Sequence, residues 1–383
     1  MPANASPVFQ EYLQSFSRAN LPGKIEVLKK AYADANAADI LGKINDYALQ
    51  FAHYNSGIYG NDSDFIQLIS IAANGIGRAR YSESIDILWD IFLIYPDSIL
   101  GVDILINLGR LGAGNEKLIT NINNFLLEQS GLYSSGGVVN YPVLSACIAA
   151  ILELKDSSSY PALFSVLHVG FPEVIAFEAS GALDLIPGNY AQFLYNVIEK
   201  NPPDEKLTAF KAGISSARLT LPERGRLAEL ALEQSLARET SPQNAPSSGD
   251  NADLTAMRYA AVLALTPLRW TRAGNLAVRH YYRVQSEYQL GTASKEHFLE
   301  AIACLGAIGN SNASLALALQ LGLINSRTER TGFFDTAITL ATVQSLGLIG
   351  DKAVFDHLYQ VRFLAYPENI QAAAREAIDR LKW

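Results

Sequence analysis

The chain has 383 residues, of which 49% are hydrophobic and 18% are charged, and its formal net charge is −8. Such a composition excludes a disordered chain, and the length exceeds what one compact core usually holds, so several domains or an elongated repeat array are expected. The acidic balance argues against nucleic-acid binding, because neutralising phosphates requires a positive field over most of the contact surface.

The N-terminal region, residues 1–62, contains two segments with the apolar spacing of helices, FQEYLQSFSRA and KIEVLKKAYADA. We expect capping helices here, with a more charged outer side, because repeat arrays need such ends to stay soluble. The start, MPANASPVFQEY, lacks the basic and apolar segments of a signal peptide. Two locations stay open: the cytoplasm if Met1 is native, and an exported or periplasmic mature form if Met1 is an addition, which the small-residue run at 3–5 slightly favours.

Residues 53–61, HYNSGIYGN, combine aromatic and turn-forming residues and are expected to form a loop. Two roles stay open for this loop. It is either a second contact region for a partner or a wide connection between two helices.

Three segments share one pattern, in which an apolar helix ends in Leu-Gly-x-(Leu/Ile)-Gly and a polar turn leads into a second amphipathic stretch: residues 106–122, 303–319 and 343–358. A glycine at a helix end can adopt the left-handed conformation that closes the last turn, and Asn, Asp or Ser can cap the next helix. The pattern therefore predicts a repeated helical hairpin.

Weaker copies of the pattern fill the rest of the chain when the first glycine is used as a marker. Successive markers are 32 to 43 residues apart, except for one step of 49, and this spacing is typical of two-helix repeats. Gly75 and Gly77 lack the third glycine and the preceding strand of a dinucleotide-binding loop, so a helix-end turn is expected there. The predicted markers are Gly75, Gly109, Leu152, Asp184, Ala217, Thr266, Gly306, Gly347 and Asp379.

The longest step contains residues 240–251, TSPQNAPSSGDN, whose Pro, Ser, Gly and Asn content predicts an exposed, flexible loop. This loop divides the predicted repeats into residues 63–239 and residues 252–383, and the second group ends in a C-terminal cap.

Together these features predict an all-α fold, specifically a right-handed α-solenoid of about eight or nine helical hairpins. The glycine-containing turn between paired helices, with small residues at the hairpin crossing, resembles the HEAT and HEAT-like (phycobilin-lyase-type) repeat family over residues 63–383. The resemblance implies a superhelix with a curved binding surface. Such repeats occur in scaffolds, adaptors, chaperone-like factors and a few enzymes, so the resemblance alone leaves the function open.

Residues 254–286 contain several arginines and aromatic residues but no Asp or Glu. On a helix over 271–289, three of these arginines lie within ~40° of one another, because separations of seven and four residues nearly close whole turns. Positions 273, 277, 280, 281, 284 and 288 then form the face that packs inward. The candidate partner-binding residues are Arg269, Trp270, Arg272, Arg279, Tyr282 and Arg283.

Two interpretations of this surface stay open. Its arginines and rings could bind an acidic segment of another protein. Alternatively, the arginines could bond to carboxylates of neighbouring repeats, such as Asp253, Glu287 or Glu296, and to free carbonyls at helix ends, with His280 and Tyr281 in the core.

The chain lacks the residue patterns of most enzymes and metal sites. Its five histidines are scattered, and the repeated His-Glu dipeptides of di-iron enzymes with this architecture are absent. His297 with Glu296 and Glu300 could form an acid–base group, although such neighbours on an amphipathic helix are more often a solvated face. Cys147 and Cys304 lie in apolar segments and are expected to be buried hydrophobic residues.

The run 301–326 carries no charge and is long enough to span a bilayer. Its centre, residues 309–312, reads GNSN, which predicts a turn between two short helices and no transmembrane segment.

We therefore expect a non-enzymatic, protein-binding scaffold or adaptor that needs no metal or cofactor and uses a curved solenoid surface. Its expected partner is another protein, with an acidic segment if residues 254–286 are the site, and nucleic acid is not expected. The alternative is a lyase-like protein that binds a chromophore or another anionic small ligand in its concavity. The oligomeric state does not follow from the sequence.

Overall fold

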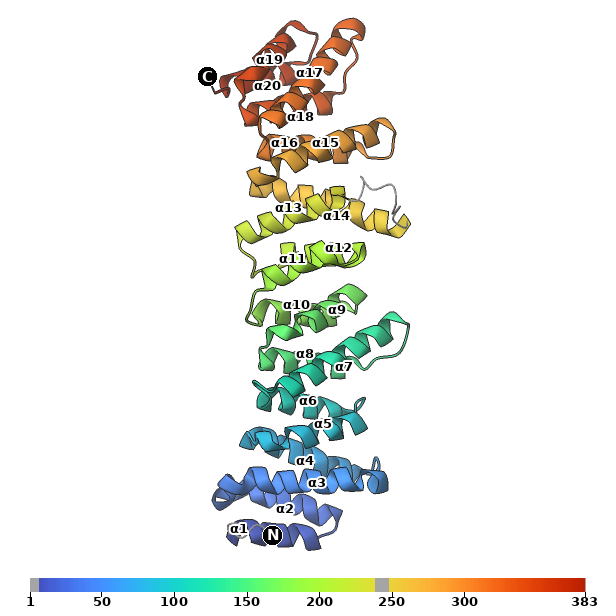
Figure 1. Cartoon of the computed structure of the whole chain (residues 1–383), viewed down its shortest axis with the longest axis vertical. Coiled ribbons are helices and arrows are strands. Elements are labelled where there is room, and N and C mark those ends of the chain that lie inside the picture. Colours follow the sequence, from blue (N-terminus) through green and yellow to red (C-terminus); the bar gives the residue numbers. More distant parts are fainter. Residues whose placement is uncertain (1–6, 238–247, 383) are drawn as a thin grey trace. The chain divides into compact units, whose positions relative to one another are not determined.

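The computed structural model of the chain describes residues 7–237 and 248–382, and Figure 1 shows that this part is built of helices. It contains twenty α-helices and several short 3-10 turns, and no strand forms among the described residues. The predicted all-α fold is therefore confirmed. The chain divides into two compact units, residues 1–190 and 191–383.

The first unit contains ten of these helices: α1 (Pro7–Arg18), α2 (Leu21–Ala33), α3 (Leu41–Tyr59), α4 (Ser63–Ala79), α5 (Ile85–Ile94), α6 (Ile99–Leu111), α7 (Glu116–Ser134), α8 (Tyr141–Leu154), α9 (Tyr160–Val169) and α10 (Glu173–Leu185). Helices α1 and α2 coincide with the two N-terminal segments that the sequence predicts as helical.

The second unit contains the other ten: α11 (Tyr190–Lys200), α12 (Pro203–Ser215), α13 (Leu221–Ala237), α14 (Ser248–Leu268), α15 (Gly274–Gln289), α16 (Lys295–Ile308), α17 (Ser311–Thr331), α18 (Thr336–Ile349), α19 (Phe355–Gln360) and α20 (Glu368–Asp379). Of the predicted loop 240–251, residues 240–247 lie outside the described part, and residues 248–251 form the first turn of α14.

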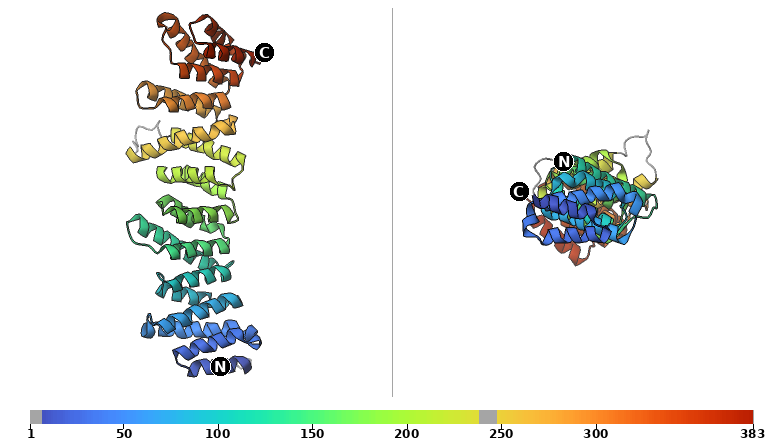
Figure 2. Two further views of the ribbon diagram at one scale, coloured as in Figure 1. Left: turned by 180° about the vertical axis from the view of Figure 1, so that it is seen from behind. Right: turned by 90° about the horizontal axis from the view of Figure 1, so that it is seen from below.

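Within each unit, many helices pack on the helix two positions further along, and pairs such as α3 and α4 or α15 and α16 also pack on each other. In the first unit α4 packs on α6 and α6 on α8, while α5 packs on α7 and α7 on α9. In the second unit α14, α16, α18 and α20 follow one another in the same way, as do α13, α15, α17 and α19. The succession of helices within each unit can be followed in both Figure 1 and Figure 2.

Side-chain caps define several of the turns between these helices. Asn140 accepts a hydrogen bond from the Val143 N–H, and Pro142 occupies the first turn of α8, where its missing N–H costs nothing. Asn310 caps α17 by accepting from the Asn312 and Ala313 N–H groups. This cap separates α16 from α17 and confirms the predicted turn in the uncharged run, although α17 is longer than predicted, with 21 residues.

The first glycine of the repeated pattern lies inside a helix, which corrects its predicted role in the turn. A Cβ atom on Gly109 would lie 2.7 Å from the Ala150 Cα of α8, and one on Gly306 would lie 2.7 Å from the Ser345 Cβ of α18. A Cβ atom on Gly347 would lie 2.8 Å from that of Ala377 in α20. These glycines therefore allow successive even-numbered helices to approach closely.

The second glycine of the pattern follows the helix end, but only one of the three is left-handed. Gly350 has a φ of 71°, as predicted, whereas Gly112 and Gly309 have φ values of −90° and −68°. The left-handed prediction is wrong for these two residues. At both positions a larger residue would be too close to its neighbours. A Cβ atom on Gly112 would collide with Leu118, and one on Gly309 would collide with the Leu305 carbonyl oxygen.

In α4 the glycine that contacts the next even-numbered helix is Gly77, not the predicted marker Gly75. A Cβ atom on Gly77 would collide with Asn107 of α6, whereas one on Gly75 would collide with Asn45 of α3. Both glycines lie within α4, so the helix-end turn predicted for them is wrong. The other markers lie near the ends of even-numbered helices: Gly109 in α6, Leu152 in α8, Asp184 in α10, Thr266 in α14, Gly306 in α16, Gly347 in α18 and Asp379 in α20, with Ala217 just after α12.

The aromatic segment 53–61 is also not the predicted loop. Residues up to Tyr59 belong to α3, and Gly60 caps this helix with a φ of 52°. The Tyr95 hydroxyl donates to the Gly60 carbonyl oxygen over 2.8 Å and so ties the helix end to the region after α5. Tyr54 and Ile58 remain highly exposed on α3.

Candidate functional site

The six candidate partner-binding residues all lie in the second unit, in the turn between α14 and α15 and along α15. Arg269, Trp270 and Arg272 belong to the turn, and Arg269 adopts a left-handed φ of 49°. Arg279, Tyr282 and Arg283 lie on α15. The positions predicted to face inward, 273, 277, 280, 281 and 284, are buried as expected, and 288 is partly buried.

Trp270 and Arg272 are joined to α13 through one carboxylate. The Trp270 Nε1–H donates to Glu229 Oε2 over 2.8 Å, and the Arg272 Nε lies 3.7 Å from the same oxygen. A Cβ atom on Gly225 would collide with the Trp270 ring, so the indole lies directly against α13. Trp270 is thus held in an inter-helix contact, whereas the Arg272 side chain is 70% exposed.

Arg279 and Arg283 contact groups of the chain in the two ways that the structural interpretation predicts. The Arg279 Nη2 lies 3.5 Å from the Leu236 carbonyl oxygen, near the end of α13. The Arg283 Nε donates to Glu287 Oε1 over 2.7 Å, one turn further along α15. Tyr282 is 46% exposed beside them.

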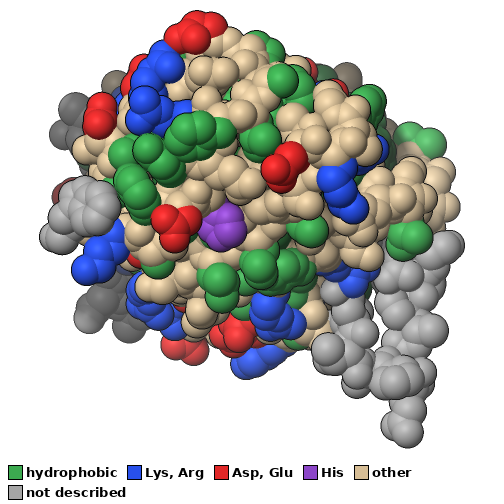
Figure 3. Space-filling view, turned by 90° about the horizontal axis from the view of Figure 1, so that it is seen from above, with side chains coloured by type: hydrophobic (Ala, Val, Ile, Leu, Met, Phe, Trp, Pro, Cys, Tyr) green, Lys and Arg blue, Asp and Glu red, His purple; other side chains and the backbone are tan. Residues whose placement is uncertain are grey.

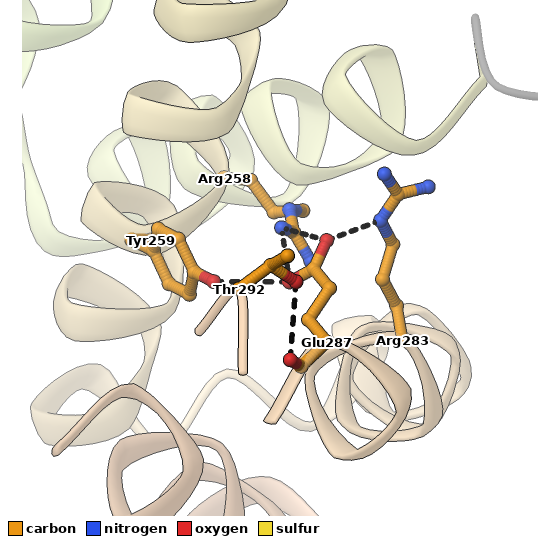
Figure 4. Close-up of polar contacts among 5 residues, drawn as sticks. All are labelled: Arg258, Tyr259, Arg283, Glu287 and Thr292. Atoms are coloured by element: carbon orange, nitrogen blue, oxygen red, sulfur yellow. Dashed lines mark hydrogen bonds and ion pairs between the residues drawn. The ribbon is translucent and has the colours of Figure 1, made fainter. Parts of the chain in front are cut away.

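Arg258, Tyr259, Arg283 and Glu287 form a compact set of contacts that we call the Glu287 cluster, shown in Figure 4. Arg258 of α14 is only 1% exposed, and its Nη2 donates to both carboxylate oxygens of Glu287 at 2.8 Å. The Tyr259 hydroxyl donates to Glu287 Oε2 over 3.0 Å. Four hydrogen bonds therefore converge on one carboxylate, which compensates for removing the charges from water.

The electrostatics of the cluster keep Glu287 ionised. Burial on its own would raise the pKa of Glu287, but the hydrogen bonds from Arg258 and Arg283 outweigh that effect and lower the pKa. The backbone takes part as well, because the Thr292 hydroxyl donates to the Glu287 carbonyl oxygen over 3.0 Å (Figure 4). The cluster thus joins α14, α15 and the segment that follows α15.

His280 lies behind the Glu287 cluster and cannot take part in acid–base chemistry near neutral pH. It is 1% exposed, and its ring meets the Tyr259 ring edge to face at 5.8 Å. Burial, together with the charge of Arg258, lowers the pKa of His280 to about 3. Neither ring nitrogen has a hydrogen-bond partner among the described residues. The His297 ring stacks on the same Tyr259 ring, with the two ring centres 3.8 Å apart.

A pocket that the sequence did not predict lies between α15, α16, α17 and α18, and we call it the α15–α18 pocket. Its volume is about 360 Å³. Phe298 and Ile338 are its buried residues, and the Tyr288 ring stacks on that of Phe298 at 5.2 Å. The lining residues are Gln285, Tyr288, Gln289, Phe298, Gln320, Ile324, Arg327, Phe333, Phe334, Asp335 and Ile338.

Charged groups at this pocket differ in whether they have partners. The Lys295 Nζ lies 2.7 Å from Asp335 Oδ2, and the other oxygen of Asp335 caps α18. Burial opposes ionisation of Asp335, but the hydrogen bond from Lys295 outweighs it and lowers the pKa of this carboxyl. The Arg327 guanidinium instead lies 4.6 Å from the centre of the exposed Phe333 ring and forms no ion pair within the described residues.

Potential metal ligands and thiols can also be placed in the described part of the chain. No group of three or more His, Cys, Asp or Glu side chains gathers there in a way that could hold a metal ion. Cys147 and Cys304 are buried as predicted, and burial raises the pKa of both thiols, that of Cys304 to about 11. Neither sulfur is therefore a thiolate at neutral pH.

None of the helices of residues 7–237 and 248–382 has the length and apolar character needed to cross a membrane. Figure 3 looks onto the C-terminal helices of the second unit, where side chains of both charge signs are interspersed with hydrophobic ones. That face offers no continuous basic surface of the kind that nucleic acid requires.

Comparison with known proteins adds no family to these observations. No protein-family model matches the sequence, and no curated protein is significantly similar to it.

Proposed function

We propose that the chain is a non-enzymatic protein-binding scaffold or adaptor, built as a right-handed α-solenoid of about eight or nine HEAT-like hairpins. One observation carries the architectural part. In both units, a glycine near the end of an even-numbered helix contacts the next even-numbered helix at the same relative position, two residues before the predicted marker of that helix. The contacts are Gly77 with Asn107, Gly109 with Ala150, Gly306 with Ser345 and Gly347 with Ala377. A constant contact register is expected where each hairpin packs only on its neighbours.

The binding part of the proposal is supported by the residues that the described surface exposes. Large apolar side chains stand out from helices of both units, including Tyr54 at 86%, Phe177 at 79% and Leu323 at 68% exposure. Aromatic side chains bury a large area when proteins associate, and exposed apolar side chains gain from being removed from water. His280 and the two thiols are buried in the core.

For the arginine-rich surface over 269–283 we propose the structural role. Glu229, Glu287 and the Leu236 carbonyl oxygen each contact at least one of four of its six residues, which supports a function in joining α13, α14 and α15. Glu287 was among the predicted partners, whereas Glu229 was not.

Native mass spectrometry of the protein isolated from its own cells tests the scaffold proposal. The expected species contains the chain together with one or more other protein chains at a fixed ratio. A chain that carries only a small molecule, with a visible absorption band, would instead support the lyase-like alternative and overturn the scaffold.

A further inference from the structure

The α15–α18 pocket combines an apolar base with polar groups at its edge, and these groups differ in how far the chain already satisfies them. Phe298 is 2% exposed and Ile338 is 6% exposed, whereas Phe333 at the edge is 60% exposed. A volume of about 360 Å³ lies near the small end of the range for ligand pockets, about 300 to 1,000 Å³. This size suits one large side chain with its adjoining backbone.

The amides of the pocket are suited to a peptide backbone. The Gln285 Nε2 donates to Gln320 Oε1 over 2.7 Å, which joins α15 to α17 across the pocket. Gln289 lies beside them with its side-chain amide unbonded within the described residues. An amide both donates and accepts, so it matches the alternating N–H and C=O groups of an extended chain.

The charge of the pocket selects an acidic ligand. Lys295 and Asp335 neutralise each other, which leaves the Arg327 guanidinium as the uncompensated charge of the lining. A guanidinium lying on an aromatic ring keeps its edge available for a carboxylate and can bind it through two N–H groups. Leu319 and Leu323 are also exposed on α17, which contributes Gln320 and Ile324 to the lining.

We propose that the α15–α18 pocket binds an aromatic side chain of an extended segment of a partner protein, with an adjacent acidic side chain of that segment paired to Arg327. This inference rests on the proposed scaffold function and assigns it a contact point. The aromatic ring packs between Tyr288, Phe298 and Phe333, and Gln289 bonds to the backbone of the bound segment.

The test uses the full chain and short blocked peptides that contain 5-fluorotryptophan, observed by ¹⁹F NMR. The first peptide is acetyl-Gly-Trp-Glu-Gly-amide, and the second has Gln in place of Glu. The first should show saturable line broadening, with an affinity about two-fold to five-fold higher than that of the second, since a partly exposed ion pair contributes up to about 1 kcal/mol. Equal binding of the two peptides, or no broadening by the first, would overturn the inference.

Two variants locate the effect. Arg327→Gln should remove the difference between the Glu and Gln peptides, whereas Arg330→Gln, one turn further along α17 and outside the lining, should keep it. If Arg327→Gln leaves the difference intact, the pairing is wrong. A protein partner that binds this variant as tightly as the wild type overturns the pocket inference alone, whereas the absence of any protein partner overturns the scaffold proposal.

Discussion

Helix α15 meets its neighbours in two contrasting ways. Toward α14, the carboxylate of Glu287 accepts hydrogen bonds from Arg258 and Tyr259. It also accepts one from Arg283 of its own helix, so this carboxylate is fully used within the chain. Toward α17 and α18, α15 lines a pocket whose edge carries Arg327 without a carboxylate partner. Both regions combine arginine with aromatic residues, but the carboxylate of the first is already bonded within the chain, whereas the Arg327 guanidinium at the pocket edge has no carboxylate partner among the described residues.

The contrast shows that the density of arginine and aromatic residues does not by itself identify a binding surface. The arginine-rich segment is conspicuous in the sequence because no Asp or Glu interrupts it, but its carboxylate partners come from α13 and from the end of α15. The pocket is inconspicuous because its residues are distributed over four helices and the turn at 332–335. Whether a group is satisfied depends on contacts between distant segments.

The largest expected effect comes from opening the closed side of α15. Glu287→Gln leaves the Arg258 charge buried without a carboxylate and should lower the free energy of unfolding by about 3 to 5 kcal/mol. Asp86→Asn breaks the exposed pair with Lys117 and should cost far less, because water already solvates both charges. Urea unfolding followed by circular dichroism measures both, and equal losses would show that the cluster is not the stronger joint.

Acid should lower the free energy of unfolding through His280, which lies beside the Glu287 cluster. Its pKa is lowered from 6.5 to about 3 in the folded chain, so below pH 6.5 the unfolded chain binds a proton that the folded chain does not. This stability contribution is complete above pH 6.5 and is lost as the pH falls toward 3, by up to about 1.4 kcal/mol per pH unit.

His280→Phe isolates this contribution, because the variant cannot take up that proton. The unfolding free energy of the wild type minus that of His280→Phe should fall by roughly 2 kcal/mol between pH 6.5 and pH 4.5. At neutral pH the two proteins should be close in stability, since the phenyl ring replaces two unpaired buried nitrogens. A difference that stays constant with pH contradicts the buried, neutral histidine.

The open side of α15 should be sensitive to the spacing of α16 and α18, which contribute Phe298 and Ile338 to the pocket. Gly306→Ala places a methyl group against Ser345 and should cost about 1 to 3 kcal/mol. Gly131→Ala, at a glycine of α7 with open space around it, should instead stabilise by about 0.5 to 1 kcal/mol. Thermal melts of both variants give the comparison, and a loss in both would remove the close-contact explanation.

The smallest effect is expected for the exposed part of the arginine-rich surface. Arg272→Ala removes a side chain that is 70% exposed and lies 3.7 Å from its carboxylate partner, so stability should change by less than about 0.5 kcal/mol. Partner binding should also be unchanged. A loss of binding in this variant, with the melting temperature preserved, would restore residues 269–283 as the partner site.

Much of the fold could be predicted because its signals are local. The apolar spacing, the Asn and Asp caps and the break at Asn310 all act within one or two helical turns. The inward positions of α15, including His280 and Tyr281, followed from the same periodicity. The role of Gly306 could not be predicted in this way, because its requirement for space is set by Ser345, which is 39 residues away.

The aromatic segment of α3 was misinterpreted for a similar reason. Its Asn, Ser and Gly residues are typical of turns, but Asn55 bonds back to the Phe51 carbonyl oxygen and the helix continues to Tyr59. The site prediction was limited further, since a pocket is defined by the convergence of helices. Its strongest local signal is the pair of aromatic residues after Gly332, followed by the α18 cap Asp335.

Hydrogen exchange, measured on the full chain with and without the protein partner that accompanies it in its own cells, tests the contrast between the two sides of α15 most directly. The account predicts that the partner slows exchange in peptides covering residues 285–298 and 320–338, while peptides covering 258–283 do not change. Protection of 258–283 with no change over 320–338 would contradict the account and place the binding surface on the arginine-rich side.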